Sequence, residues 1–108
     1  MLFRSLKGTT EQKATTERDL EERVLLDVEE KFRKLGEARS LLDALTDQRE
    51  AEQTKLGEVT NRYNQKAALL SDLSQQQAAV SQAEAQYQQA LAGFWTARAN
   101  FEKAIGME

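Results

Sequence analysis

Apolar residues recur with a helical spacing along most of the chain. From Leu35 onward the steps alternate between three and four residues, which is the heptad pattern of a coiled-coil seam. The pattern predicts a long helix over about residues 10–65, and its seam consists of Leu35, Ala38, Leu42, Leu45, Arg49, Glu52, Leu56, Val59 and Tyr63. Upstream, from Leu20 to Phe32, the apolar residues step by four, so the stripe drifts around the helix.

A second seam predicts another helix over about residues 71–105. From Val80 onward it alternates large with small side chains, so that alanines permit close approach and large residues fill the facing gaps. Gly106 suits the C-terminal cap of this helix. The second seam consists of Leu73, Gln76, Val80, Ala83, Tyr87, Ala90, Phe94, Ala97, Phe101 and Ala104.

The rhythm breaks at about residues 66–70, where a turn would let the two seams face each other. Folding the chain about residues 67 and 68 pairs Leu42 with Phe94, Leu35 with Phe101, and Arg49 with Tyr87. The alternative is one straight helix, roughly 140 Å long at about 1.5 Å per residue, which would need a partner along its whole length. We predict an all-α fold: a long antiparallel two-helix coiled-coil hairpin over residues 10–108, preceded at residues 1–9 by a disordered or non-native leader.

Composition excludes several classes of function. The chain of 108 residues has a net charge of -3, which argues against nucleic acid as the main partner. It has no cysteine and no histidine, so disulfides, zinc–thiolate sites and the usual proton shuttles and thiol nucleophiles are missing. We expect no enzyme activity, no metal and no cofactor. No apolar run approaches the roughly 20 residues that span a bilayer, and the N-terminal apolar stretch is too short for a secretory signal.

Two surfaces lack an obvious partner in an isolated hairpin. The apolar segment Val24–Val28 lies beyond the predicted end of the second helix, and exposed apolar surface of this kind marks a contact site. Between Leu73 and Ala97, Glu84 is the only charged residue, which suggests a helix packed on more than one side. Candidate contacts with neighbouring hairpins are Val24, Leu25 and Trp95, although Trp95 equally fits the edge of its own seam.

The segment from Arg62 to Gly106 resembles the TolC family of outer-membrane efflux proteins. In the second repeat of that family, an Arg-Tyr pair ends one long helix, a turn follows, and an acidic residue starts a helix rich in Ala and Gln with regular aromatics. The residues that carry the resemblance are Arg62-Tyr63, Asp72-Leu73, Tyr87, Ala90-Leu91, Trp95, Ala97, Phe101 and Ala104–Gly106. The resemblance extends over roughly residues 20–106, and the family's remaining parts are absent, so we expect a fragment of a longer protein.

The resemblance implies part of a periplasmic helical barrel beneath an outer-membrane β-barrel. It implies a homotrimer that acts with a periplasmic adaptor and an inner-membrane pump, in efflux or type I secretion. The residues at the hairpin tip, where the tunnel entrance would lie, are Arg62, Tyr63, Lys66 and Asp72. The outer membrane would be reached through parts of the protein that this chain lacks.

Each tip residue also has an ordinary structural explanation. Asp72 matches an acidic position that rings the closed entrance in the family, but an acid in a first helical turn also complements the helix dipole. Tyr63 matches a tyrosine that holds the entrance closed, but it also fits the seam. The family commonly has Gly where Lys66 stands and Ser or Thr where Leu69 stands, so the turn departs from the family pattern.

Polar residues within the seam have alternatives too. Arg49 and Glu52 could pair with each other, contact a neighbouring hairpin or remain solvated, and Arg49 could lie on the ring of Tyr87. Two further functions remain open for the whole chain. It could be a periplasmic adaptor hairpin, although the adaptor tip spacing is not found, or a free-standing coiled-coil scaffold.

Overall fold

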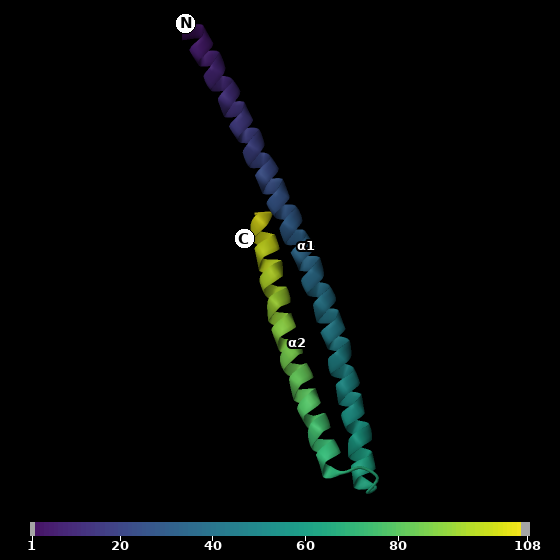
Figure 1. Cartoon of the computed structure of the whole chain (residues 1–108). Coiled ribbons are helices and arrows are strands. Elements are labelled where there is room, and N and C mark those ends of the chain that lie inside the picture. Colours follow the sequence, from purple (N-terminus) through teal and green to yellow (C-terminus); the bar gives the residue numbers. More distant parts are fainter. Residues whose placement is uncertain (1, 107–108) are drawn as a thin grey trace.

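Two helices account for nearly all of the described chain, in the order α1 (Leu2–Asn64) and α2 (Leu70–Ala104). The computed structural model describes residues Leu2–Gly106, with side chains from Thr16 onward. The helices form an antiparallel hairpin, which confirms the predicted all-α fold (Figure 1). Its extents are 96 × 21 × 14 Å. The long dimension agrees with the roughly 1.5 Å that each residue adds to a helix.

The N-terminal end of α1 differs from the expectation. A disordered or non-native leader was expected over residues 1–9, with a helix start near Thr10; the disordered alternative is wrong, because α1 already begins at Leu2. The reason is that nothing in the segment stops a helix: it has no proline, and Gly8 costs only about 1 kcal/mol relative to Ala. The chain therefore has one long helix extending well past the end of α2 (Figure 1).

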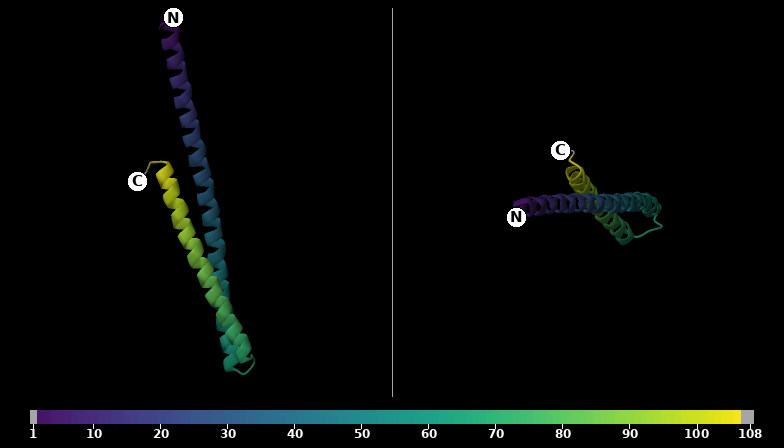
Figure 2. Two further views of the ribbon diagram at one scale, coloured as in Figure 1. Left: turned by 60° about the vertical axis from the view of Figure 1, so that its left-hand side comes forward. Right: turned by 90° about the horizontal axis from the view of Figure 1, so that it is seen from above.

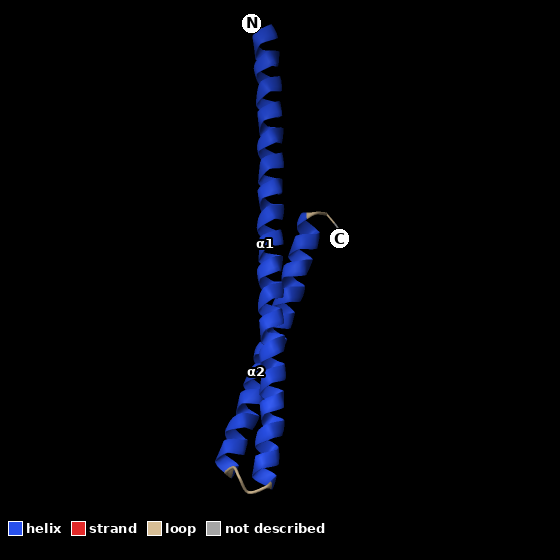
Figure 3. Cartoon of the chain, turned by 90° about the vertical axis from the view of Figure 1, so that its right-hand side faces the viewer, coloured by secondary structure: helices blue, strands red, loops and turns tan. Residues whose placement is uncertain are grey.

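The helices cross along a seam and do not lie strictly parallel. Figure 2, in the view from above, and Figure 3 show α2 passing across α1. Helices cross in this way when the side-chain ridges of one helix pack into the grooves of another. Among the described residues the buried side chains are Val59, Gln76, Ala83 and Ala90.

The predicted seam positions coincide with the less exposed residues. On α1, every seam residue from Leu35 to Val59 is half-buried or buried, and Tyr63 is exposed. On α2, every seam residue from Leu73 to Ala104 is half-buried or buried. The ring of Phe101 meets Phe32 at 5.7 Å between centroids, and it also lines a groove with Leu35, its predicted partner. The core is thus a narrow strip, and the other sides of both helices face outward.

The C-terminal end of α2 is capped as the sequence predicts. Gly106 has a positive φ of 80°, a conformation that glycine adopts without a steric penalty. Its N–H donates to the Lys103 carbonyl at 3.1 Å, and the Ile105 N–H donates to the Phe101 carbonyl at 3.1 Å. These bonds satisfy carbonyls that would otherwise lack partners at the helix end.

Candidate functional site

The described part of the chain offers several surfaces for interaction. No group of three or more acidic residues in it is placed to hold a metal ion. None of its helices combines the length and apolar character that a membrane crossing requires. Four candidate sites are described below: the polar seam residues Arg49 and Glu52, the hairpin tip, the two lateral sides, and the part of α1 that extends beyond the end of α2.

Arg49 interrupts the apolar seam and is held by α2. Its guanidinium carbon lies 4.2 Å from the centroid of the Tyr87 ring, so among the alternatives left open for Arg49 the structure shows the stack on Tyr87. Its Nε also lies 3.4 Å from Glu84 Oε2, an ion pair between the helices whose geometry does not make a hydrogen bond. A cation held between a ring and a carboxylate fixes which levels of the two helices face each other. Glu84, the isolated charge of α2's middle section, therefore has a structural partner.

Glu52 is held by Gln76, a residue of the second seam that the sequence did not pair with it. The Gln76 side-chain amide donates to Glu52 Oε2 at 2.6 Å and to the Glu52 backbone carbonyl at 3.0 Å. Gln76 is 6% exposed, so this amide is one of the few buried polar groups of the hairpin. The suggested pair between Arg49 and Glu52 is not found among the described contacts, since each has its partner on α2.

The tip ends α1 with a Schellman motif. The Ala67 N–H donates to the Arg62 carbonyl at 2.7 Å, and the Lys66 N–H donates to the Tyr63 carbonyl at 3.0 Å. In this motif the residue just after the helix, here Lys66, adopts the left-handed conformation, and Lys66 has a φ of 62°. Lysine thus occupies a position that glycine fits best, because a left-handed conformation costs other residues about 1–2 kcal/mol.

We expect Lys66→Gly to stabilise the hairpin. Relief of the left-handed strain, partly offset by the greater freedom of glycine in the unfolded chain, should raise the free energy of unfolding by about 0.5–1 kcal/mol. Urea unfolding followed by circular dichroism measures this change. Lys66→Ala is the matched control, since it removes the charge but keeps a Cβ. An equal gain in both variants would show that charge, and not backbone strain, sets the effect.

Asp72 caps its own helix at the tip. Its Oδ2 accepts a hydrogen bond from the Leu69 N–H at 3.1 Å, which is half of a capping box. The other half is missing because Leu69, at the N-cap, has no side-chain acceptor. Asp72 is nonetheless exposed, and it lines a groove of about 310 Å³ together with Arg62. The helix-start role predicted for Asp72 is therefore present, and its carboxylate also faces solvent.

Leu69, Leu70 and Tyr63 give the tip an exposed apolar surface. Leu69 is 69% exposed and Leu70 is 61% exposed, so two adjacent leucines project at the turn. Tyr63, in the last turn of α1, is 37% exposed. The structure brings Arg62 and Asp72 to one groove, whereas Tyr63 and Lys66 do not line it. Leu69 was noted only as a departure from the family's turn, and the exposure of both leucines was not predicted, although two apolar residues in a predicted turn were a visible signal.

The two lateral sides of the hairpin differ in shape. On one side, a groove of about 650 Å³ is lined by both helices, including Leu41, Ala90 and Gly93. A Cβ added to Gly93 would meet nothing within 4 Å, so this part of the groove is open. Gly93 directly precedes the seam residue Phe94 and Trp95 directly follows it. Successive helical residues point about 100° apart, so Trp95 lies on the other side of the hairpin.

Trp95 projects from its side of α2 with a limited set of contacts. It is 52% exposed and meets the ring of Phe94 edge-on at 5.7 Å. The Arg98 guanidinium lies 5.2 Å from its ring centroid, and Arg98 also pairs with Glu102 at 3.0 Å. The contact with Phe94 is what packing at the edge of its own seam predicts, and the contact with a neighbouring hairpin stays a prediction.

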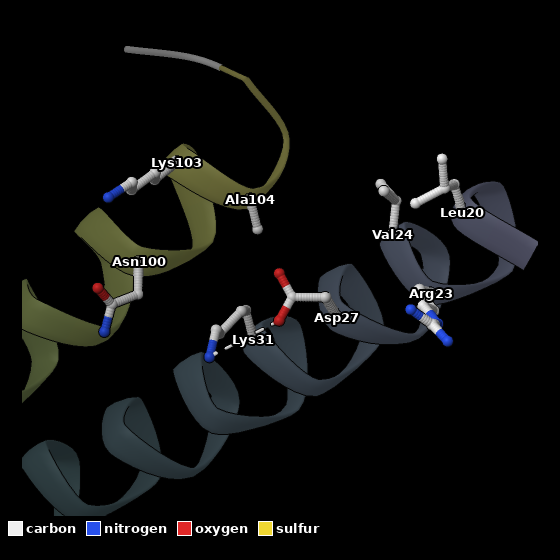
Figure 4. A pocket seen from close by; sticks show the side chains of 8 residues that line it. All are labelled: Leu20, Arg23, Val24, Asp27, Lys31, Asn100, Lys103 and Ala104. Carbon is white, nitrogen blue, oxygen red and sulfur yellow. Dashed lines mark ion pairs between the residues drawn. The ribbon is translucent and has the colours of Figure 1, made fainter. Parts of the chain in front are cut away.

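The free end of α1 carries the other predicted contact residues. Val24 and Leu25 are each 58% exposed. Figure 4 shows Val24 beyond the last turn of α2, near an open notch of about 610 Å³. This surface is unpartnered within the hairpin.

Comparison of the chain with protein-family models, with curated proteins and with solved structures finds no match.

Proposed function

We propose that the hairpin is a wall unit of a TolC-like periplasmic tunnel, part of an outer-membrane channel used in efflux or type I secretion. In this proposal, copies pack side by side, and the tips face an adaptor and an inner-membrane pump. The observation that carries the proposal is the complementarity of the two lateral sides: Trp95 projects from one, and the groove at Gly93 opens on the other.

The groove and Trp95 lie at nearly the same height on the hairpin. Gly93 and Trp95 are two positions apart in the sequence, which corresponds to about 3 Å along a helix axis. Neighbouring hairpins of the same orientation could thus insert Trp95 into the next groove with little shift along the axis. An interface that joins one surface of a protein to a different surface of the next copy repeats from copy to copy. The copies form a closed ring when the rotation between neighbours adds up to a full turn, and they form an open filament when it does not. A small axial shift favours the ring, and a ring of hairpins encloses a tunnel.

The charge distribution of α2 supports packing on both sides. Glu84 is the sole charged residue from Leu73 to Ala97, and it is already paired with Arg49. The outward positions carry mostly Ala, Gln and Ser, including the exposed Ala85 and Gln88. Such a surface loses little hydration when another helix covers it, because no unpaired charge is desolvated.

The tip is suited to the entrance of such a tunnel. Asp72 is exposed at the first turn of α2, and in a trimer three copies would form a negative constriction that favours cations. The exposed leucines at positions 69 and 70 give the tip an apolar surface for contact with an adaptor.

Blocking the groove tests the proposal. Gly93→Leu should weaken self-association at least about tenfold, because the leucine side chain occupies the space that Trp95 of a neighbour would enter. The monomer should remain folded, since Gly93 faces open space and leucine is the better helix former. Analytical ultracentrifugation over a concentration series measures the association.

The matched control is Gly57→Leu. Gly57 is also helical and open to solvent, but it lies outside the groove. It should associate as the wild-type chain does. A wild-type chain that stays monomeric at every concentration, or equal weakening in both variants, would contradict the proposed lateral packing.

A further inference from the structure

The turn between the helices consists entirely of residues that favour a helix. We define the hinge as residues 65–69, which join α1 to α2 and have the sequence Gln-Lys-Ala-Ala-Leu. All five residues belong to the strongest helix formers, and no glycine or proline occurs between Gly57 and Gly93. Turns are normally rich in Gly, Pro, Asn, Asp and Ser, which favour a non-helical backbone. The local sequence therefore favours one continuous helix, whereas the hairpin requires the chain to reverse here.

The geometry of the hinge reflects this conflict. Lys66 holds a left-handed φ of 62°, which is costly for a residue with a Cβ. Leu69 stands at the N-cap of α2 without a side-chain acceptor, and Leu69 and Leu70 are 69% and 61% exposed. A short hinge under strain favours the exchange of an element between two copies of a chain, because the exchanged form relieves the strain.

The seam of α1 continues through the hinge when the chain is read as one helix. Continuing from Tyr63, the steps of three and four residues reach Lys66 and Leu70. The next step reaches Leu73, the first residue of the seam of α2. One irregular step of three residues then leads to Gln76, and coiled coils accommodate such an irregularity by a local change in winding. A continuous helix would therefore present one seam along its paired length.

Two such helices can pair antiparallel and keep the contacts between α1 and α2. The hairpin stacks Arg49 on Tyr87. In an antiparallel pair of straight chains, with the two-fold axis at the hinge, the same contact forms between one copy and the other. At the axis, Leu70 of each copy faces Lys66 of the other and packs on the apolar stem of the lysine. The exposed leucine is then covered, and the lysine takes an ordinary helical conformation.

We infer that the chain pairs with a second copy by exchanging α2 at the hinge. In the exchanged dimer, α1 and α2 form one helix over residues 2–104, about 155 Å long at about 1.5 Å per residue, whereas the hairpin extends over 96 Å. Hairpin and exchanged dimer are two states of one chain, and protein concentration shifts the balance between them. The exchange uses the seam and leaves both lateral sides free, so it is independent of the proposed tunnel packing.

Distances within one chain distinguish the two states. Glu50 and Ala85 are exposed and lie at one level of the hairpin, since their neighbours Arg49 and Glu84 form an ion pair between the helices. The chain has no cysteine, so cysteines that carry nitroxides can replace Glu50 and Ala85. Labelled chains are unfolded and refolded with an excess of unlabelled chains, so that electron–electron double resonance reports the distance within one chain.

The dimer fraction obtained at high protein concentration should give a distance of about 50 Å, which is the length of continuous helix between the two labels. The hairpin is 21 Å across, so its labels should lie within about 30 Å of each other. A dimer that shows only the short distance, or a chain that forms no dimer at any concentration, would overturn the inference.

A proline at the start of α2 separates the two states. Leu70 is the first residue of α2 and follows Leu69, whose ψ of 157° suits a residue before proline, so the hairpin accepts Leu70→Pro. Within a continuous helix, the same proline removes a hydrogen bond and clashes with the preceding turn. Leu70→Pro should therefore weaken the dimer at least about a hundredfold. Leu70→Ala, the matched control, permits both states and should change the dissociation constant less than about tenfold.

A second pair of variants distinguishes exchange from lateral packing. Gly93→Leu should leave the exchanged dimer unchanged, because Gly93 lines the lateral groove and does not belong to the seam. In the Leu70→Pro background, where exchange is blocked, Gly93→Leu acts on lateral packing alone. Circular dichroism confirms that each variant keeps its helices. A self-association that Gly93→Leu abolishes and Leu70→Pro leaves intact would be lateral packing without exchange, and it would overturn the inference while supporting the proposed function.

Discussion

Replacing Ala83 with leucine should lower the free energy of unfolding by about 1–3 kcal/mol. Ala83 is 3% exposed and Ala90 is 7% exposed, so the two alanines mark where α2 lies closest to α1. A larger side chain at position 83 must push the helices apart or take up a strained rotamer. Loss of close approach there would also separate Arg49 from Tyr87 one turn along α2.

The matched control is Ala85→Leu on the exposed side of the same helix. It adds the same atoms at nearly the same helix propensity, so its effect should stay within about 0.5 kcal/mol. Urea unfolding followed by circular dichroism at matched protein concentrations compares the two variants. An Ala83→Leu loss no greater than that of the control would mean that the helices do not approach closely at Ala83.

Gln76→Leu should cost about 1–3 kcal/mol, because it removes the amide that bonds the Glu52 carboxylate at 2.6 Å. The carboxylate would then sit beside an apolar seam without its donor. Adding Glu52→Leu should recover most of the loss, since replacing both partners with apolar groups leaves no unsatisfied charge.

A double-mutant cycle with Glu52→Leu, Gln76→Leu and the pair measures this coupling. The control cycle combines Gln76→Leu with Leu41→Ser, which shares no described contact with Gln76, and its effects should add. Additive effects of the Glu52 and Gln76 substitutions would show that their hydrogen bond contributes nothing to stability.

Much of the hairpin follows from its periodicity. A heptad seam determines which face of each helix is covered, and the interruption of the heptad spacing locates the turn. These two rules predicted the covered positions of both helices apart from Tyr63, which is exposed, and they placed Arg49 opposite Tyr87, where the two side chains stack. The glycine that the family has at the position of Lys66 marked this turn as unusual, but the left-handed conformation of the lysine itself was not predicted.

Other features depend on details that periodicity does not encode. The start of α1 at Leu2 was missed because helix-favouring residues give no sign of where a helix begins without a cap. The bond between Gln76 and Glu52 was missed because side-chain conformation, and not seam position, decides which polar groups meet across a seam. The lateral grooves required knowledge of how the helices cross, since Gly93 and Leu41 belong to no shared sequence motif.

The most direct test of side-by-side assembly is a photo-crosslink from the projecting aromatic residue. The benzophenone amino acid p-benzoylphenylalanine replaces Trp95, so an aromatic side chain remains, and isotope-labelled and unlabelled chains are mixed before irradiation. Mass spectrometry then distinguishes links between chains from links within one. We predict links between chains to the groove of a neighbour, at Leu41, Gln89 or Gly93. Links confined to a single chain, or links between chains that fall outside this groove, would contradict the lateral packing on which the tunnel proposal depends.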